Sequence, residues 1–179
     1  MRKLHNDELK RKSVRQFRES EKSPFTIILD NIRSNSNVGS VFRTADAFLT
    51  ECIYLCGITG RPPHREIHKT ALGATESVAW KYCSHTLDAI SELKLKGYRI
   101  VGIEQAEGSV SLSEFRVTEG LRYALVFGHE VNGIDQQVLN ECDDVVEIPQ
   151  FGTKHSFNIA VSAGIVLWEL NRQKKRRSQ

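Results

Sequence analysis

The chain has 179 residues, of which 40% are hydrophobic, and its 25 basic and 22 acidic residues give a formal net charge of +3. This length and apolar content predict a single folded domain with a substantial core. No stretch approaches the ~18 consecutive apolar residues that a membrane span requires, and no signal peptide is visible at the polar start of the sequence. We therefore expect a cytoplasmic protein with no membrane partner.

Positive charge is concentrated at the two ends of the chain. Residues 1–22 contain eight basic and four acidic residues, and residues 174–177 are four consecutive basic residues, so the stretch between is mildly acidic. We expect three parts: a basic N-terminal helical extension at 1–22, the main domain at 23–173 and a basic tail at 174–179. Basic ends on an acidic body are typical of a protein that holds an anionic polymer partly by its termini. Two solvated helix ends would give the same pattern, and this alternative stays open.

Apolar periodicity and turn residues predict the elements in chain order. They are a surface helix at 7–21, a buried strand at 25–30, a helix at 37–48, a strand at 52–56, a long loop with one helical turn at 57–77, a weak strand at 79–83, a helix at 87–96, strands at 98–103, 123–127 and 145–148, and a final helix from about 156 to 172. Strands that alternate with helices predict an α/β fold with a mostly parallel sheet and helices on both faces.

The final predicted helix is unusually apolar. Between Phe157 and Leu170 its only charged residue is Glu169, and Ala160 and Gly164 contribute to a stripe of small residues. A helix that is apolar almost all round is buried on more than one side. We therefore expect a homodimer in which this helix lies at the interface.

Several other chemistries find little support in the sequence. The four cysteines form no Cys-x-x-Cys pair, and Cys52 and Cys56 fall on one face of a predicted strand, where we expect buried free thiols. His64 and His68 have the spacing of zinc ligands on a helix, but no third ligand is near, so we expect no metal and interpret them as an RNA contact or a solvated turn. Ser156 follows a histidine but lies in no nucleophile elbow. The glycine patterns of dinucleotide sites, P-loops and class I methyltransferases are missing.

Three motifs place small or amide residues and one charged group beside apolar strands, where ligands bind in α/β proteins. They are residues 37–45, residues 126–133, and residues 148–149 followed by Ser156-x-Asn158. In order and spacing these motifs resemble the SpoU/TrmH branch of the SPOUT RNA methyltransferases, over roughly residues 25–170. The resemblance implies transfer of a methyl group from S-adenosylmethionine to a ribose 2′-hydroxyl of RNA. It also implies a SPOUT fold with a deep C-terminal trefoil knot, which nothing in the periodicity reveals.

The resemblance implies roles for individual residues. The expected catalytic group is Arg43, with Asn37, Glu130, Ser156 and Asn158 positioning it, the loops and the nucleotide. The expected cofactor site contains Phe127, Gly128, Ile148 and Phe157, and Gln105 joins them because it follows a predicted strand. An arginine stays protonated, so we interpret Arg43 as orienting the ribose and phosphate and stabilising alkoxide charge. A structural ion pair between Arg43 and Glu130 is the alternative.

Two residues depart from the family pattern. His129 stands where the family often has asparagine, and it either titrates near neutrality or replaces one hydrogen bond. Phe157 stands where leucine is usual, and it would enlarge the apolar wall of the cofactor site. RNA is expected to cross loops that carry five basic residues, beside the basic ends of the chain. These residues are Arg33, Arg61, Arg65, Lys69 and Lys154.

The substrate is expected to be RNA rather than DNA. Transfer RNA is preferred because small relatives without extra domains often act on it, and ribosomal RNA is close behind. Two alternatives remain: a non-catalytic RNA-binding or ribosome-assembly protein that keeps the knot, and a knotted enzyme that methylates a base of transfer RNA.

Overall fold

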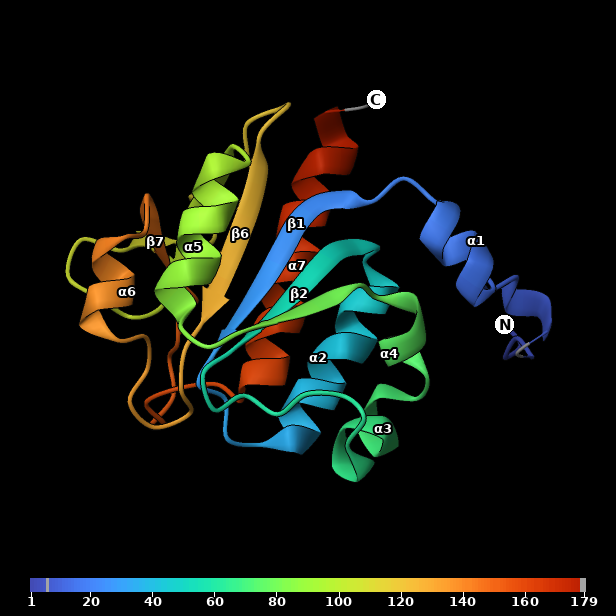
Figure 1. The fold of residues 1–179 in the computed structure, drawn as a ribbon. Coiled ribbons are helices and arrows are strands. Elements are labelled where there is room, and N and C mark those ends of the chain that lie inside the picture. The colour runs from blue at the N-terminus through green and yellow to red at the C-terminus, as the bar shows by residue number, and fades with distance from the viewer. Residues whose placement is uncertain (6, 178–179) are drawn as a thin grey trace.

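The computed structural model describes residues 1–5 and 7–177, and within them a seven-stranded sheet forms the centre of the molecule (Figure 1). The strand order is β3-β2-β1-β6-β4-β7-β5, and every pair of neighbours is parallel. The strands are β1 (Ser23–Asp30), β2 (Thr50–Cys56), β3 (Trp80–Cys83), β4 (Tyr98–Ile103), β5 (Val110–Ser111), β6 (Arg122–Phe127) and β7 (Asp144–Glu147). The predicted parallel α/β architecture is confirmed.

Helices cover both faces of the sheet, as predicted. One face packs against α2 (Asn35–Ala47), α3 (Arg65–Ala71), α4 (Ala74–Ser77) and α7 (Ile159–Arg177), and the other against α5 (Thr86–Leu95) and α6 (Gln136–Asn140). Because side chains alternate along a strand, Ile27 and Leu29 of β1 enter the first core while Ile28 enters the second. All strands run in one direction, so their carboxyl ends share one edge.

Helix α2 starts at a capped turn and packs closely on α3. The Ser34 side chain accepts a hydrogen bond from the Asn37 backbone N–H at 3.2 Å, which satisfies one of the free donors at the helix start. A Cβ on Gly39 would lie 2.1 Å from Thr70 Oγ1 and 2.4 Å from the Ile67 carbonyl oxygen. Only glycine therefore permits this approach of the two helices.

Helix α2 runs in the same direction as α7. At their beginnings, the Asn158 side chain donates a hydrogen bond of 3.0 Å to the Asn37 side chain. At the far end, the rings of Phe48 and Trp168 meet edge to face with centroids 6.5 Å apart. The start of α7 and the start of α2 therefore lie together, and the later parts of both helices lie together.

The N-terminal extension differs from the single helix predicted at 7–21. It contains a 3-10 helix (Asp7–Leu9) and α1 (Val14–Glu19), which are separated where Lys10 adopts a φ of 46°. A capping box between Ser13 and Gln16 starts α1 afresh. Phe17 is buried, and Arg18 donates to the backbone carbonyl of Glu76, so α1 is anchored although it projects from the body in Figure 1.

Other boundaries also differ from prediction. The long loop at 57–77 contains α3 and α4, and the short elements β5 and α6 were not predicted. Helix α7 starts at Ile159 rather than near residue 156 and continues to Arg177, into the predicted basic tail. Residues 178 and 179 of that tail, and the side chains of 175–177, lie outside the described residues.

Two findings concern membrane spans and the cysteine thiols. None of the described helices has the length and apolar character to cross a bilayer. The four cysteines are free, and burial raises the pKa of the Cys52 thiol to about 11 and of the Cys56 thiol to about 12. These two thiols are therefore protonated and unreactive at neutral pH.

Candidate active site at the carboxyl ends of the central strands

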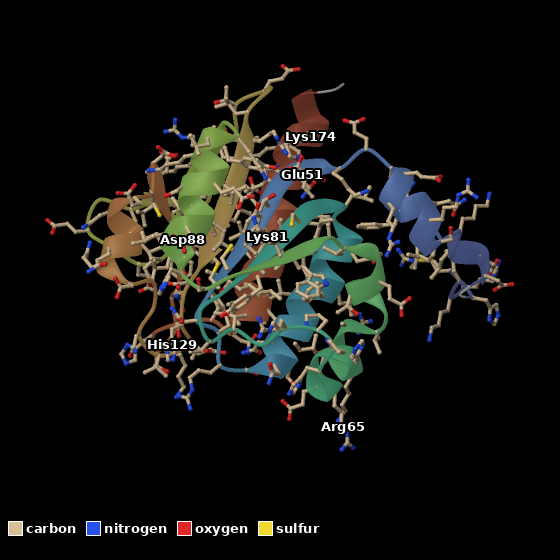
Figure 2. All side chains as sticks on the ribbon, in the orientation of Figure 1. Glu51, Arg65, Lys81, Asp88, His129 and Lys174 are labelled. Carbon is tan, nitrogen blue, oxygen red and sulfur yellow. The ribbon has the colours of Figure 1, made fainter. Side chains whose placement is uncertain are left out.

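A cavity lies where the central strands β4, β6 and β7 end. Its volume of about 470 Å³ falls within the range of small-molecule sites. The lining residues come from the loops after these strands and from the start of α7: Ile103, Glu104, Gln105, Phe127, Gly128, His129, Glu130, Val131, Asn132, Gly133, Ile148, Gln150, His155, Ser156, Phe157, Asn158, Ile159 and Ser162. Figure 2 shows His129 at this end of the molecule.

All five residues predicted for the cofactor site line this cavity. Phe127 is buried in the core at the end of β6, whereas the Phe157 side chain is 41% exposed just before α7. Ile148 packs partly against the core after β7. The Gln105 side chain donates a hydrogen bond of 2.8 Å to the backbone carbonyl of His155, which joins the loop after β4 to the segment before α7. The apolar wall and the polar rim thus come from distant parts of the chain.

The turn at 128–134 is held tightly by its own backbone. His129 and Gly133 exchange backbone hydrogen bonds of 3.0 and 2.9 Å, and His129 Nδ1 accepts from the backbone N–H groups of Val131 and Asn132. A Cβ on Gly128 would lie 2.3 Å from the Gly133 carbonyl carbon. The Gly128 backbone is therefore packed against its own turn, where a side chain has no room. His129 acts as a hydrogen-bonding group of that turn.

Glu104 supports the same turn and was missed in the sequence. Its carboxylate accepts a hydrogen bond of 3.0 Å from the Ile134 backbone N–H and another of 2.9 Å from that of Gln105. Glu104 could have been predicted in the same way as Gln105, because both are polar residues that follow an apolar strand. Val131 and Asn132 were also missed as lining residues, because turn geometry alone brings them to the cavity.

Glu130 links the second motif to the first. Its carboxylate accepts hydrogen bonds from the backbone N–H groups of Arg33 and Ser34, both at 3.0 Å, and from the Asn37 side chain at 3.3 Å. Burial opposes ionisation of Glu130, but these hydrogen bonds outweigh it and lower the pKa below its ordinary value. Within one chain, the ion pairs of the described residues do not include the alternative pair between Glu130 and Arg43.

The third motif closes the network. The Asn37 side chain donates to Glu130 and accepts from Asn158, and Asn158 in turn accepts from the Ala160 backbone N–H at 2.9 Å near the start of α7. Ser156 lines the cavity beside them. Four of the five residues expected at the catalytic centre therefore meet at one place.

Arg43 lies apart from the other four. It is exposed in the second half of α2, does not line the cavity, and its side chain makes no hydrogen bond or ion pair with the described residues. It lies instead in a surface groove between α2 and the N-terminal segment that contains Lys10, Arg11 and Lys12. Within one chain, the expected arrangement around Arg43 is not formed.

The five basic residues expected to contact RNA are all exposed. Arg33, Arg61 and Lys154 lie on loops, but Arg65 and Lys69 lie on α3 rather than on a loop. In Figure 2, Arg65 lies at the same end of the molecule as His129, whereas Lys174 lies at the opposite end. The start of the basic C-terminal tail is therefore distant from this surface, contrary to expectation.

His64, one of the two histidines considered as zinc ligands, has other partners. His64 caps α3, because its Nδ1 accepts a hydrogen bond of 3.3 Å from the Glu66 backbone N–H. His64 Nε2 also lies 3.4 Å from the Asn35 side-chain nitrogen. Among the described residues, no group of three histidine, cysteine, aspartate or glutamate side chains could hold a metal ion.

Comparison with known proteins agrees with this geometry. The family described as the SpoU rRNA Methylase family matches residues 24–168. The 23S rRNA (guanosine-2′-O-)-methyltransferase RlmB of Neisseria meningitidis serogroup B is 33% identical over 151 residues, which cover 84% of this chain and 59% of that protein. The chain spans 57–64% of the length of the curated relatives it matches.

Two solved structures have the same fold. The AdoMet-bound rRNA methyltransferase from Sinorhizobium meliloti is 28% identical, with a TM-score of 0.78 over 87% of this chain and 59% of that one. A structure described as giving insights into the 2-OH methylation of C/U34 on tRNA is 27% identical, with a TM-score of 0.75 over 87% of this chain and 100% of that one. The predicted resemblance is confirmed, and the chain belongs to the SpoU rRNA methylase family.

Proposed function

We propose that this protein transfers a methyl group from S-adenosylmethionine to a ribose 2′-hydroxyl of RNA, in the cytoplasm. The observation that carries the proposal is the meeting of all three motifs around one cavity of ligand size. Relatives named as rRNA methyltransferases, one of them with AdoMet bound, support the reaction and the cofactor.

The cavity residues fit such a cofactor. Ile148 and Phe157 offer apolar surface, and the turn at 128–134 offers backbone groups fixed by Glu104. S-adenosylmethionine supplies a methyl group bonded to a positively charged sulfur. The chain's own contribution is to hold this group and the ribose in line, and such alignment can supply several kcal/mol of the barrier.

We propose that the protein works as a homodimer through α7. Phe157, Val161 and Trp168 expose 41%, 49% and 63% of their surface along one side of this segment in the single chain. Large apolar side chains gathered on one exposed stripe are typical of an interaction surface. A two-fold contact, the commonest arrangement in soluble oligomers, would cover this stripe on both chains.

The same dimer explains the separate position of Arg43. The cavity lies at the start of α7, and Arg43 lies in the second half of α2, which runs alongside α7 in the same direction. If two α7 helices pack antiparallel, the cavity of one chain approaches the second half of α2 of its partner. We propose that Arg43 acts at the partner's cavity, where it orients the ribose and phosphate and stabilises developing alkoxide charge.

Two variants test this shared site. Arg43→Ala is expected to bind S-adenosylmethionine normally in calorimetry and to transfer no methyl group. Ile148→Arg is expected to fill the cavity and to abolish cofactor binding. Equal mixing of these two inactive chains would restore roughly a quarter of the wild-type rate, because half of the dimers are mixed and each holds one intact site. No restored activity after verified subunit exchange, or a monomer in light scattering at micromolar concentration, would contradict the shared site.

We also propose that the chain forms the deep trefoil knot implied by its family. The hydrogen bond between Gln105 and His155 supports this, since it brings the loop after β4 against the segment that leads into α7.

Transfer RNA is the proposed substrate. The relative described for methylation of C/U34 on tRNA supports this choice, because the match covers that chain completely, while RlmB favours ribosomal RNA as the second candidate. The test is incubation with labelled S-adenosylmethionine and unmodified cellular RNA separated by size. Label in the transfer RNA fraction is expected. Label only in ribosomal RNA would identify ribosomal RNA as the substrate instead. Failure to bind S-adenosylmethionine would favour a non-catalytic RNA-binding protein.

A further inference from the structure

Among the residues that the structure describes, two arginine side chains lie over tyrosine rings, one at each end of the parallel strands. The guanidinium carbon of Arg61 lies 4.3 Å from the ring centroid of Tyr82, and that of Arg122 lies 4.1 Å from the ring centroid of Tyr98. The two pairs have similar geometry, so differences in their surroundings indicate what each one does.

The pair of Arg122 and Tyr98 has a complete set of partners. Arg122 forms an ion pair of 3.1 Å with Glu51, and the Tyr98 hydroxyl donates to the same carboxylate at 2.7 Å. Tyr98 is only 7% exposed. Figure 2 shows Glu51 at the end of the molecule opposite to His129. This pair neutralises its own charge and stabilises the fold away from the cavity.

The pair of Arg61 and Tyr82 lacks such neutralisation. Arg61 is exposed, and its side chain makes no ion pair or hydrogen bond with any of the residues that the structure describes. Tyr82 is 36% exposed on the edge strand β3, and its hydroxyl donates to the Gly57 carbonyl at 3.1 Å, which fixes the ring against the loop. One face of the guanidinium therefore rests on an anchored ring, and its charge is available to an anion.

The loop that carries Arg61 is fixed to the candidate active site. The Ile58 backbone N–H donates to the Asn31 side chain at 3.2 Å, and the Ile32 backbone N–H donates to Thr59 Oγ1 at 2.9 Å. Asn31 and Ile32 belong to the loop after β1, and the next two residues of this loop donate backbone hydrogen bonds to the Glu130 carboxylate at the cavity. Strands β3 and β6 are three spacings apart in the sheet, or about 14 Å. This distance equals roughly four nucleotides of a stacked strand at ~3.4 Å each.

We infer that the guanidinium of Arg61, supported by Tyr82, is a stacking site for an RNA base that lies a few nucleotides from the methylated ribose. A planar cation on an aromatic ring presents a flat face to a base and a positive charge to the adjacent phosphates. The inference rests on the proposed function, because it needs RNA to cross this edge of the sheet. It distinguishes Arg61 from the other exposed basic residues, whose charge alone is expected to act.

The test separates the planar shape of Arg61 from its charge. The probes are a short oligouridine and a ribose-phosphate polymer of the same length without bases, and the measured quantity is the ratio of their affinities for the full-length protein. Arg61→Lys keeps the charge and removes the plane, and Tyr82→Leu removes the support. Both are expected to reduce the preference for oligouridine about 5- to 140-fold, the usual effect of losing one base stack. Arg122→Lys, which changes the other stacked pair, should leave the ratio unchanged.

These measurements distinguish loss of the stacking site from failure of the proposed methyl transfer. If wild-type protein prefers oligouridine and Arg61→Lys binds both probes like wild type, the stacking site is refuted while methyl transfer to RNA by the same preparation remains intact. A wild type that binds both probes equally also refutes the stacking site. If the wild type transfers no methyl group to any RNA but Arg61→Lys loses the base preference, the stacking site stands and the proposed reaction fails.

Discussion

Removing the Glu130 carboxylate is predicted to destabilise the protein and to disturb the site together. In Glu130→Ala, the backbone N–H of Ser34 and the side chain of Asn37 lose acceptors in partly buried positions, whereas water can replace the acceptor of the exposed Arg33 N–H. Two such losses at about 1–1.5 kcal/mol each give a decrease of about 2–3 kcal/mol in the free energy of unfolding. At about 2–4 °C for each kcal/mol in a domain of this size, the melting temperature falls by about 4–12 °C.

Thermal unfolding and methyl transfer measured on the same preparation check this prediction. Glu107→Ala removes an exposed carboxylate whose side chain forms no hydrogen bond or ion pair with the described residues, and it is the matched control. The stabilisation by Glu130 is complete above the ordinary carboxylate pKa and is lost as pH falls through its lowered folded pKa. The difference between wild type and Glu130→Ala should therefore shrink in acid. A melting temperature equal to that of Glu107→Ala at neutral pH would refute the reasoning.

Three further substitutions have defined outcomes. Gly39→Ala places a Cβ against Thr70 and the α3 backbone, so we expect about 1–3 kcal/mol lower stability in denaturant unfolding. Gly128→Ala must displace the turn at 128–134, and calorimetry should show at least about tenfold weaker binding of S-adenosylmethionine. Gly152→Ala, which meets no atom within 4 Å, is the control for both and should match wild type. Trp168→Glu should give a folded monomer in light scattering, and an unchanged dimer would contradict an interface on α7.

The sequence could predict the sheet because its central strands are continuous apolar runs. Strands β1, β4 and β6 are buried on both faces, so their sequences are mostly apolar and easily recognised. Strand β5 has two residues and α6 has five, too few for any period to emerge. The interruption of the predicted N-terminal helix at Lys10 depends on a positive φ, which the local sequence does not predict. The Ser13 cap that follows is a recognisable helix start.

Site residues that directly follow a strand could be predicted from the sequence. Residues whose role depends on the direction of a side chain on a helix or in a turn could not. Gln105 and Gly128 reach the cavity because each follows a parallel strand whose carboxyl end faces it. Arg43 was grouped with Asn37 because both belong to one motif. Six residues on an α-helix, however, separate two side chains by about 120° around the axis, so these two point to different surroundings. The turn hydrogen bonds of His129 required the folded turn itself.

The most direct measurement is alkaline digestion of RNA that the protein has labelled with S-adenosylmethionine. Alkali cleaves RNA through attack of the 2′-hydroxyl on the neighbouring phosphate, so a methylated ribose protects the bond that follows it. The account predicts label in alkali-resistant dinucleotides, and no such label with Arg43→Ala. Label released entirely as mononucleotides would show methylation of a base and would contradict ribose 2′-hydroxyl transfer.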